Sequence, residues 1–206
     1  MQNTIVLSAS TLRIGRDGIV TSDDAFYKDD EGKEIVISQY YSQLEPVIRY
    51  MLSVINTRND ITDKTLNIVM LCTEEVKNVA SFKEKNGNDY CMNAVEYLKH
   101  RINVCEEKET GQTIDFETID LDKRKPYKAI RETIEKIRSI KAETNDVKGL
   151  FWVDVHGGLR QIAMALEAII SLLEIDEIIP DDIFSVEYSR EENKSEITNE
   201  NELFKI

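Results

Sequence analysis

The sequence has few of the residues that build disulfides and metal centres. Its 206 residues include three cysteines and two histidines, and Cys72, Cys91 and Cys105 form no C-x-x-C pair. An odd cysteine count without that spacing argues against a disulfide framework and indicates reduced thiols. His100 and His156 are too few and too far apart in the sequence to suggest a histidine metal site. We expect neither a metal nor a cofactor.

Positive charge is scarce as well, and long apolar runs are missing. The chain has 26 Lys and Arg and 39 Asp and Glu, which gives a net charge of -13. Because phosphate contacts usually need Lys or Arg, we expect no binding of long nucleic acid or of anionic membrane. No basic-then-apolar leader and no run of about 18 apolar residues occurs, which predicts a cytoplasmic protein. Any anionic ligand must be held locally.

Several enzyme signatures are absent too. Without G-x-G-x-x-G or G-x-x-x-x-G-K-[ST], neither a dinucleotide enzyme nor a P-loop NTPase is supported. Ser10, His156 and Asp154 could be combined into a Ser/His/Asp catalytic triad, but the sequence has no G-x-S-x-G nucleophile elbow to support it.

The periodicity of apolar residues predicts alternating strands and helices. At 41% hydrophobic and 32% charged residues, the chain can build one core, so we expect a single domain over residues 1–206. Short apolar runs predict strands at 4–7, 66–73, 113–121 and 150–155. Apolar residues three and four apart predict helices at 38–55, 88–104, 126–140 and 159–173.

Two regions do not follow that alternation. Residues 14–37 contain turn signals between β-prone pieces and predict an irregular or hairpin insertion. Residues 183–188 and 202–206 are β-like pieces that flank a charged turn at 189–195. The whole pattern predicts a Rossmann-like α/β fold, with a doubly wound, mainly parallel sheet, helices on both faces and a C-terminal extension resembling a β-hairpin.

The segment Leu150–Arg160 stands out because an apolar strand runs through two glycines into an amphipathic helix. Glycines let a ligand approach the backbone, and the unpaired N–H groups of a helix start attract anions. Two other expected strands also end in polar residues, at Ser8–Thr11 and Thr73–Glu75. Carboxyl ends of parallel strands share one edge, where such sheets bind ligands. The sequence therefore predicts a composite site there.

Each polar residue at that edge also has a plain structural explanation. Asp154 can cap the local turn, and Ser and Thr are common wherever a strand enters a loop. Arg160 opposes the dipole of its helix, which either a ligand anion or a neighbouring carboxylate would explain.

The strand, the run Asp154-Val155-His156-Gly157-Gly158-Leu159-Arg160 and the apolar helix resemble the CRISPR-associated Rossmann-fold (CARF) sensor domains, particularly those with an Asp-x-Thr-His-Gly-x-Arg-like signature. The likeness covers most of the chain, including Ser8–Thr11 and Leu71–Glu75. This chain lacks the Thr before His156 and has Gly158 where one glycine is usual.

The resemblance implies a homodimer whose two rims face each other and bind one cyclic oligoadenylate, a tetra- or hexa-adenylate. Such a sensor of the type III CRISPR antiviral response controls an effector allosterically. The ligand contacts that the resemblance implies are Ser8, Ala9, Ser10, Thr11, Thr73, Glu74, Asp154, His156, Gly157, Gly158, Leu159 and Arg160.

Other interpretations stay open. The same site would serve a ring nuclease that slowly cleaves the cyclic oligoadenylate without metal, with Ser10, His156 and Arg160 as candidate catalytic residues. An unrelated nucleotide-binding Rossmann domain is a third hypothesis. No Arg-x(4–6)-His ribonuclease motif occurs, so the chain is either a stand-alone sensor or the sensory part of a larger effector protein.

Overall fold

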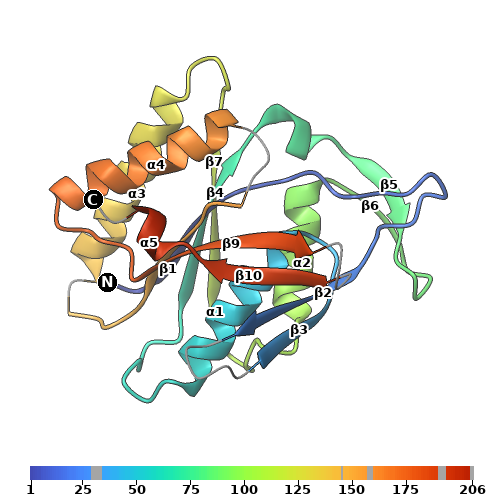
Figure 1. Cartoon of the computed structure of the whole chain (residues 1–206), viewed down its shortest axis with the longest axis horizontal. Coiled ribbons are helices and arrows are strands. Elements are labelled where there is room, and N and C mark those ends of the chain that lie inside the picture. The colour runs from blue at the N-terminus through green and yellow to red at the C-terminus, as the bar shows by residue number, and fades with distance from the viewer. Residues whose placement is uncertain (29–33, 145, 157–159, 190–193, 205–206) are drawn as a thin grey trace.

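The computed structural model describes residues 1–28, 34–144, 146–156, 160–189 and 194–204. Its elements are shown in Figure 1. In chain order they are β1 (Asn3–Ser8), β2 (Asp23–Lys28), β3 (Glu34–Tyr40), α1 (Glu45–Thr57), β4 (Leu66–Cys72), the 3-10 helix η1 (Glu74–Lys77), β5 (Ala80–Lys83), β6 (Asp89–Met92), α2 (Ala94–Val104), β7 (Ile114–Asp120), α3 (Tyr127–Glu143), β8 (Phe151–Asp154), α4 (Arg160–Ile175), β9 (Asp182–Ser189), β10 (Lys194–Asn199) and α5 (Asn201–Phe204).

An eight-stranded sheet forms the centre, in the order β3-β2-β10-β9-β8-β1-β4-β7. The adjacent strands in the run β9-β8-β1-β4-β7 are parallel to each other. Strand β10 is antiparallel to β9, and β3 is antiparallel to β2. Strand β7 forms one edge of the sheet. The predicted α/β class, the mainly parallel sheet and the C-terminal hairpin are confirmed.

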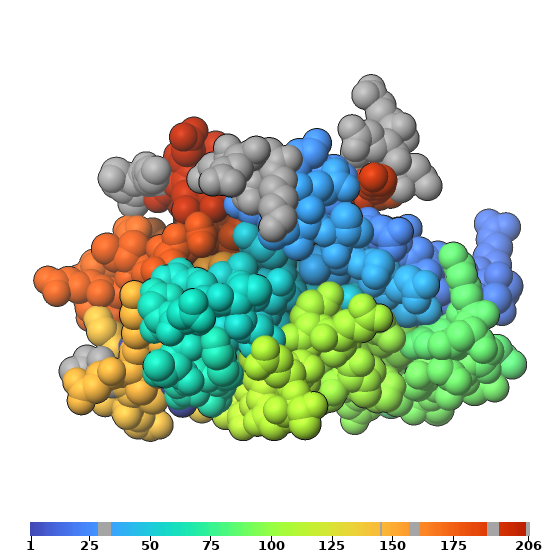
Figure 2. All heavy atoms as spheres, turned by 90° about the horizontal axis from the view of Figure 1, so that it is seen from below, coloured from blue at the N-terminus to red at the C-terminus, as the bar shows by residue number. Residues whose placement is uncertain are grey.

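Helices cover both faces of this sheet. In β1, Ile5 and Leu7 join the core cluster under α1 and α2, whereas Val6 joins the cluster under α3 and α4. This alternation is the two-residue period of a strand that is buried on both sides. Figure 1 shows α3 and α4 at the left, away from α1 and α2. Figure 2, a view from below, shows α1 (cyan) and α2 (yellow-green) next to each other.

Two predicted helices begin later than expected. The helix expected over 38–55 starts at Glu45, with Pro46 in its first turn, because residues 38–40 continue β3. The helix expected over 88–104 starts at Ala94, because residues 89–92 form β6 and pair with β5 in a separate hairpin. Asn93 caps that helix through a reciprocal capping box with Glu96.

The β-like piece predicted at 202–206 is wrong. Residues 201–204 form the short helix α5, started by Asn199, whose side chain accepts the Asn201 N–H at 2.9 Å. The strand that pairs with β9 is β10 instead, in which Ser195 and Ile197 alternate inward. Within the described ranges, no helix has the length and apolar character needed to cross a membrane.

Gly149 allows β8 to enter the sheet beside β1. A Cβ on Gly149 would lie 2.5 Å from the backbone nitrogen of Asn3 and 2.6 Å from the Met1 carbonyl oxygen. The following residue, Leu150, is hydrogen-bonded to the Asn3 side chain and to the Thr4 N–H. The contact is with backbone, so it can be relieved only by moving β1.

We therefore expect Gly149→Ala to lower the free energy of unfolding by about 3 kcal/mol. Gly111→Ala is the comparison, because a Cβ there meets open space at φ +85 and adds only about 1 kcal/mol of backbone strain. Urea denaturation measures both. Equal losses for the two variants would contradict the close approach of β8 to the chain start.

Candidate functional site

The carboxyl ends of β1 and β8 lie at the topological switch point of the sheet, where the strands that follow in the chain are added on opposite sides. From β1 the chain adds β4 and then β7 on one side, and it then crosses to add β8 and β9 on the other. Val6 of β1 pairs with Val153 of β8, one or two residues before Ser8 and Asp154. Ligands of open α/β sheets bind at such a switch point. The fold therefore favours this end of the sheet as a site.

The predicted polar clusters follow three neighbouring strands at this edge. Ser8 is the last residue of β1, Thr73 follows β4, and Asp154 ends β8. Arg160 begins α4, but its side chain lies outside the described residues, as do Gly157, Gly158 and Leu159.

Two faces of the sheet contribute to the site. Ser8 shares the face of Val6, under α3 and α4, whereas Asp154 shares the face of Trp152, under α1 and α2. Ala9 is buried, and Thr11 is exposed on the loop that leaves β1. The β1 loop and the β8 junction thus approach the edge from opposite sides of one sheet.

Three buried oxygens of described residues at this edge have no hydrogen-bond partner in the described part of the chain. Among the described residues, Ser8 Oγ, Ser10 Oγ and Asp154 Oδ2 have none, and neither has Trp152 Nε1. Ser8 is 2% exposed and Asp154 is 0% exposed. Burying an unpaired polar atom costs about 1–3 kcal/mol, so each such atom needs an explanation, such as a bound water or ion, a strained segment or a role in binding or catalysis. These oxygens are suited to a polar ligand.

Asp154 shapes the junction and holds a proton. Its Oδ1 accepts the backbone N–H of His156 at 2.8 Å, which fixes the turn after β8. Burial raises the pKa of Asp154 to about 8, although the bond from the His156 N–H partly opposes this shift. At neutral pH the carboxyl is therefore mostly uncharged, and a neutral acid can donate its proton in a hydrogen bond.

The His156 side chain contacts Gln43 through Nε2. The Gln43 side-chain N–H lies 3.2 Å from His156 Nε2 when the carboxamide is oriented to satisfy both its ends, and Gln43 Oε1 then accepts from Arg13 Nε at 3.1 Å. Burial lowers the pKa of His156, a hydrogen bond to the main chain of Val186 raises it, and the Arg13 charge lowers it further. His156 is thus a neutral imidazole whose Nε2 lone pair is occupied.

Gln43 reaches His156 from a turn that a buried carboxylate stabilises. Glu45 is 0% exposed, and its Oε1 accepts the backbone N–H groups of Tyr41 at 3.0 Å and Ser42 at 2.9 Å. Burial raises the pKa of Glu45, while Arg101 and the two backbone bonds oppose the shift. The turn before α1 is therefore fixed from its C-terminal side.

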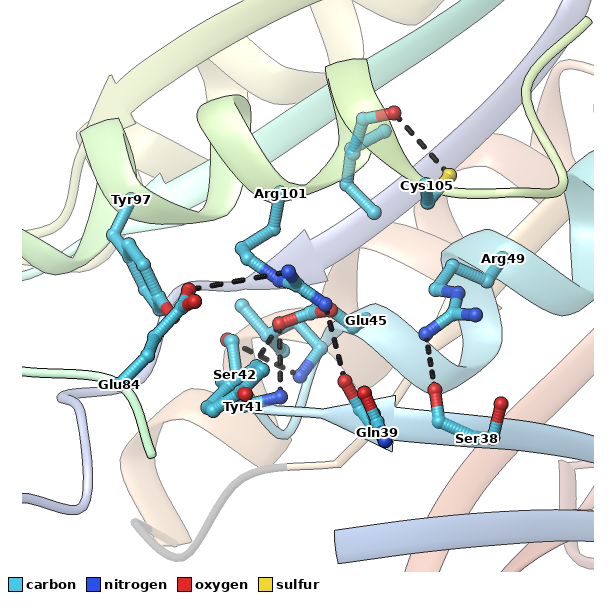
Figure 3. A network of polar contacts seen from close by, with 12 residues as sticks. Ser38, Gln39, Tyr41, Ser42, Glu45, Arg49, Glu84, Tyr97, Arg101 and Cys105 are labelled. Carbon is cyan, nitrogen blue, oxygen red and sulfur yellow. Dashed lines mark hydrogen bonds and ion pairs between the residues drawn. The ribbon is translucent and has the colours of Figure 1, made fainter. Parts of the chain in front are cut away.

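Arg101 of α2 extends this network to the small hairpin (Figure 3). Its Nε lies 3.3 Å from Glu45 Oε2, and its guanidinium also donates to the Gln39 carbonyl at 3.1 Å. Glu84, which follows β5, lies 3.9 Å from Arg101 and accepts from the Tyr97 hydroxyl at 2.6 Å. Buried pairs need such additional bonds to offset their desolvation.

Sequence reasoning missed Arg13, Gln43 and Glu45. A signal existed for the turn, because Ser42-Gln43-Leu44-Glu45 has the S-x-x-E spacing of a helix start before an apolar run. No local pattern relates Gln43 to His156, since that contact depends on how α1 packs on the sheet.

Thr73 and Glu74 lie beside a separate hollow. A cavity of about 510 Å³ at the carboxyl ends of β4 and β7 is lined by both residues. Around it, Lys77 pairs with Asp120, and Lys123 lies 2.7 Å from Glu75. Among the described residues, none of the β1–β8 junction lines this cavity, so the structure does not bring Thr73 and Glu74 together with Ser8 and Asp154.

No model of a known protein family matches the chain, and no curated protein matches it significantly.

The buried carboxyl of Asp154 should make the free energy of unfolding depend on pH, and a single substitution can test this. The folded protein keeps the Asp154 proton up to about pH 8, whereas the ordinary pKa is 3.8. Between these two pKa values the folded protein binds one proton more than the unfolded chain. The free energy of unfolding is therefore highest, as far as Asp154 decides it, below about pH 4. It falls toward pH 8 by at most about 1.4 kcal/mol per pH unit. Asp154→Asn keeps an acceptor for the His156 N–H and does not titrate. Its stability relative to wild type should therefore rise from pH 5 to pH 8 in urea denaturation.

Asp122→Asn is the matched control. Asp122 Oδ1 accepts the Arg124 N–H at 2.8 Å in the same kind of turn, but Asp122 is exposed. Urea denaturation of this variant measures what the same substitution costs in an exposed turn. For Asp154→Asn, a difference from wild type that stays constant with pH would show that Asp154 does not hold its proton.

Proposed function

We propose that the edge above β1 and β8 binds a cyclic oligoadenylate, as the sensor of a type III CRISPR antiviral response that controls an effector allosterically. The observation that carries this proposal is the set of three buried oxygens at the switch point, on Ser8, Ser10 and Asp154, that have no hydrogen-bond partner in the described part of the chain. The resemblance of residues 154–160 to the CARF signature supports the choice of ligand.

Neutral donors suit an anionic ligand in a chain of net charge -13. The Ser8 and Ser10 hydroxyls and the protonated Asp154 carboxyl can each donate to a phosphate or ribose oxygen without adding charge. The backbone N–H groups at the start of α4, which begins at Arg160, add the partial positive charge of a helix N-terminus. Such groups bind a phosphate locally although the protein as a whole repels anions.

The outer face of α4 supports a homodimer. Met164 is 56% exposed, Leu172 43% and Ile175 77%, and their spacing places them along one side of the helix. Exposed apolar stripes of this kind mark protein contacts. A two-fold contact between α4 helices would bury these side chains.

Slow, metal-free cleavage of the ring is the alternative. General-base catalysis by His156 would require its Nε2 to be released from Gln43. Cleavage would therefore depend on orienting a ribose 2′-hydroxyl toward its phosphodiester, through Ser10, backbone N–H groups and Arg160. Incubation of the protein with cyclic tetra- and hexa-adenylate in EDTA, followed by chromatography, separates the two functions. An intact ring after many hours supports binding alone.

Ser10→Ala should weaken ring binding without lowering stability. The Ser10 hydroxyl has no partner among the described residues, so its removal costs the free protein no hydrogen bond. Loss of a bond to a charged phosphate should weaken binding of the ring by about tenfold or more. Calorimetric titration with both rings and urea denaturation measure the two effects.

Ser185→Ala is the control and should behave in the opposite way. The Ser185 hydroxyl is 2.6 Å from Glu200, so its loss should lower stability and leave ring binding unchanged. If wild type binds neither ring, the proposed function is wrong. If Ser10→Ala binds as tightly as wild type, Ser10 does not contact the ring.

Leu172→Glu should convert the dimer into a monomer. A charge in the centre of an apolar interface would be buried without a partner, which opposes association. Light scattering after size-exclusion chromatography measures the mass. Val79→Glu, at a side chain that is 63% exposed between η1 and β5, should leave the dimer intact. A monomeric wild type would contradict the proposed dimer.

A further inference from the structure

A second cavity lies beyond the loop that leaves β1. It has a volume of about 560 Å³ and lies between that loop, the segment leading into β2, and β9. Its lining includes Leu12, Arg13, Ile14, Thr21, Asp23 and Tyr188. The volume is within the range of small-molecule sites.

The backbone holds the wall of this cavity in shape. The Arg13 carbonyl accepts the Thr21 N–H at 3.0 Å and the Thr21 hydroxyl at 3.3 Å. Two residues further along, the Gly15 N–H donates to the Ile19 carbonyl at 2.8 Å. The loop is thus a small closed hairpin, and the cavity exists before any ligand enters.

The lining combines apolar faces with one polar edge. Leu12, Ile14 and the Tyr188 ring offer apolar and aromatic surface, and Tyr188 is 45% exposed. Arg13 and Asp23 place a donor and an acceptor side by side, with NH1 and Oδ2 4.0 Å apart. A purine needs a surface on which its ring can stack and polar groups along its edge.

One side chain separates this cavity from the β8 junction. Arg13 lines the cavity and donates to Gln43, and Gln43 donates to His156 at the junction. A phosphate bound at the strand ends and a base in the cavity would lie on either side of Gln43. This is the arrangement of a nucleotide, in which a ribose separates base and phosphate.

We propose that this cavity receives an adenine of the ring, an inference that rests on the proposed function. Tyr188 stacks on the base, the Asp23 carboxylate accepts from the exocyclic amino group, and Arg13 donates to the neighbouring ring nitrogen. Adenine presents such an amino donor beside an acceptor nitrogen. Hypoxanthine has an oxygen in place of the amino group, and that oxygen would face the Asp23 carboxylate.

The test titrates the protein calorimetrically with whichever adenylate ring, tetra or hexa, binds wild type more tightly. Tyr188→Ala should weaken binding by about five- to a hundredfold through the loss of stacking. Tyr188→Phe keeps the ring and should stay within about twofold of wild type. Urea denaturation of both variants checks that the fold is retained.

A second titration uses the inosinate ring of the same size. Wild type should prefer the adenylate ring, and Asp23→Asn should reduce that preference, because an amide can donate to the hypoxanthine oxygen. Folded Tyr188→Ala that binds like wild type, or equal preference in wild type and Asp23→Asn, would overturn the subsite and leave the proposed function standing. Failure of wild type to bind any adenylate ring would overturn both.

Discussion

The buried carboxylate of Glu45 is the constraint on which the arrangement of the site depends. It accepts two backbone N–H groups of the turn before α1 and pairs with Arg101 of α2, so it joins the end of β3, the start of α1 and the second helix of that face. Withdrawing this charge from water is costly, and the surrounding donors offset the cost only in one geometry. That geometry presents Gln43 to His156 and, through Gln43, fixes Arg13. The arrangement of the candidate site is thus determined by a polar cluster beneath α1 and α2.

Charge is distributed unevenly between the protein and this edge. The chain has an excess of 13 negative charges, yet at the switch point Asp154 is kept neutral by burial and His156 is neutral as well. A general basic surface is therefore unnecessary for binding an anion, because neutral hydroxyl, carboxyl and backbone donors act where water is excluded. Selectivity would come from how these donors are placed, and the long-range field of an acidic protein would keep polyanions such as long nucleic acids away.

Much of the fold could be predicted because its strands and helices carry strong periodic signals. The apolar run of β4 and the apolar stripe of α4 are local patterns, and both elements form where they were expected. The start of α2 was placed too early, although Asn93 and Glu96 have the spacing of a capping box. At the site, Ser8 and Asp154 could be placed at one edge from topology alone. The contact between Gln43 and His156 could not, since it arises from the packing of α1 against the sheet.

The insertion of β10 between β9 and β2 links the two ends of the chain. Ser195 pairs with Ala25 and Glu196 with Phe26, so one edge of the β2–β3 hairpin gains its neighbour only from the last strand of the sheet. Closing so long a loop slows folding, and an open strand edge is prone to pair with other chains. During synthesis, the β2–β3 hairpin and the loop leading into it would lack their neighbouring strand until β10 has left the ribosome. The edge between β2 and β9 would then be among the last parts of the molecule to take its final shape.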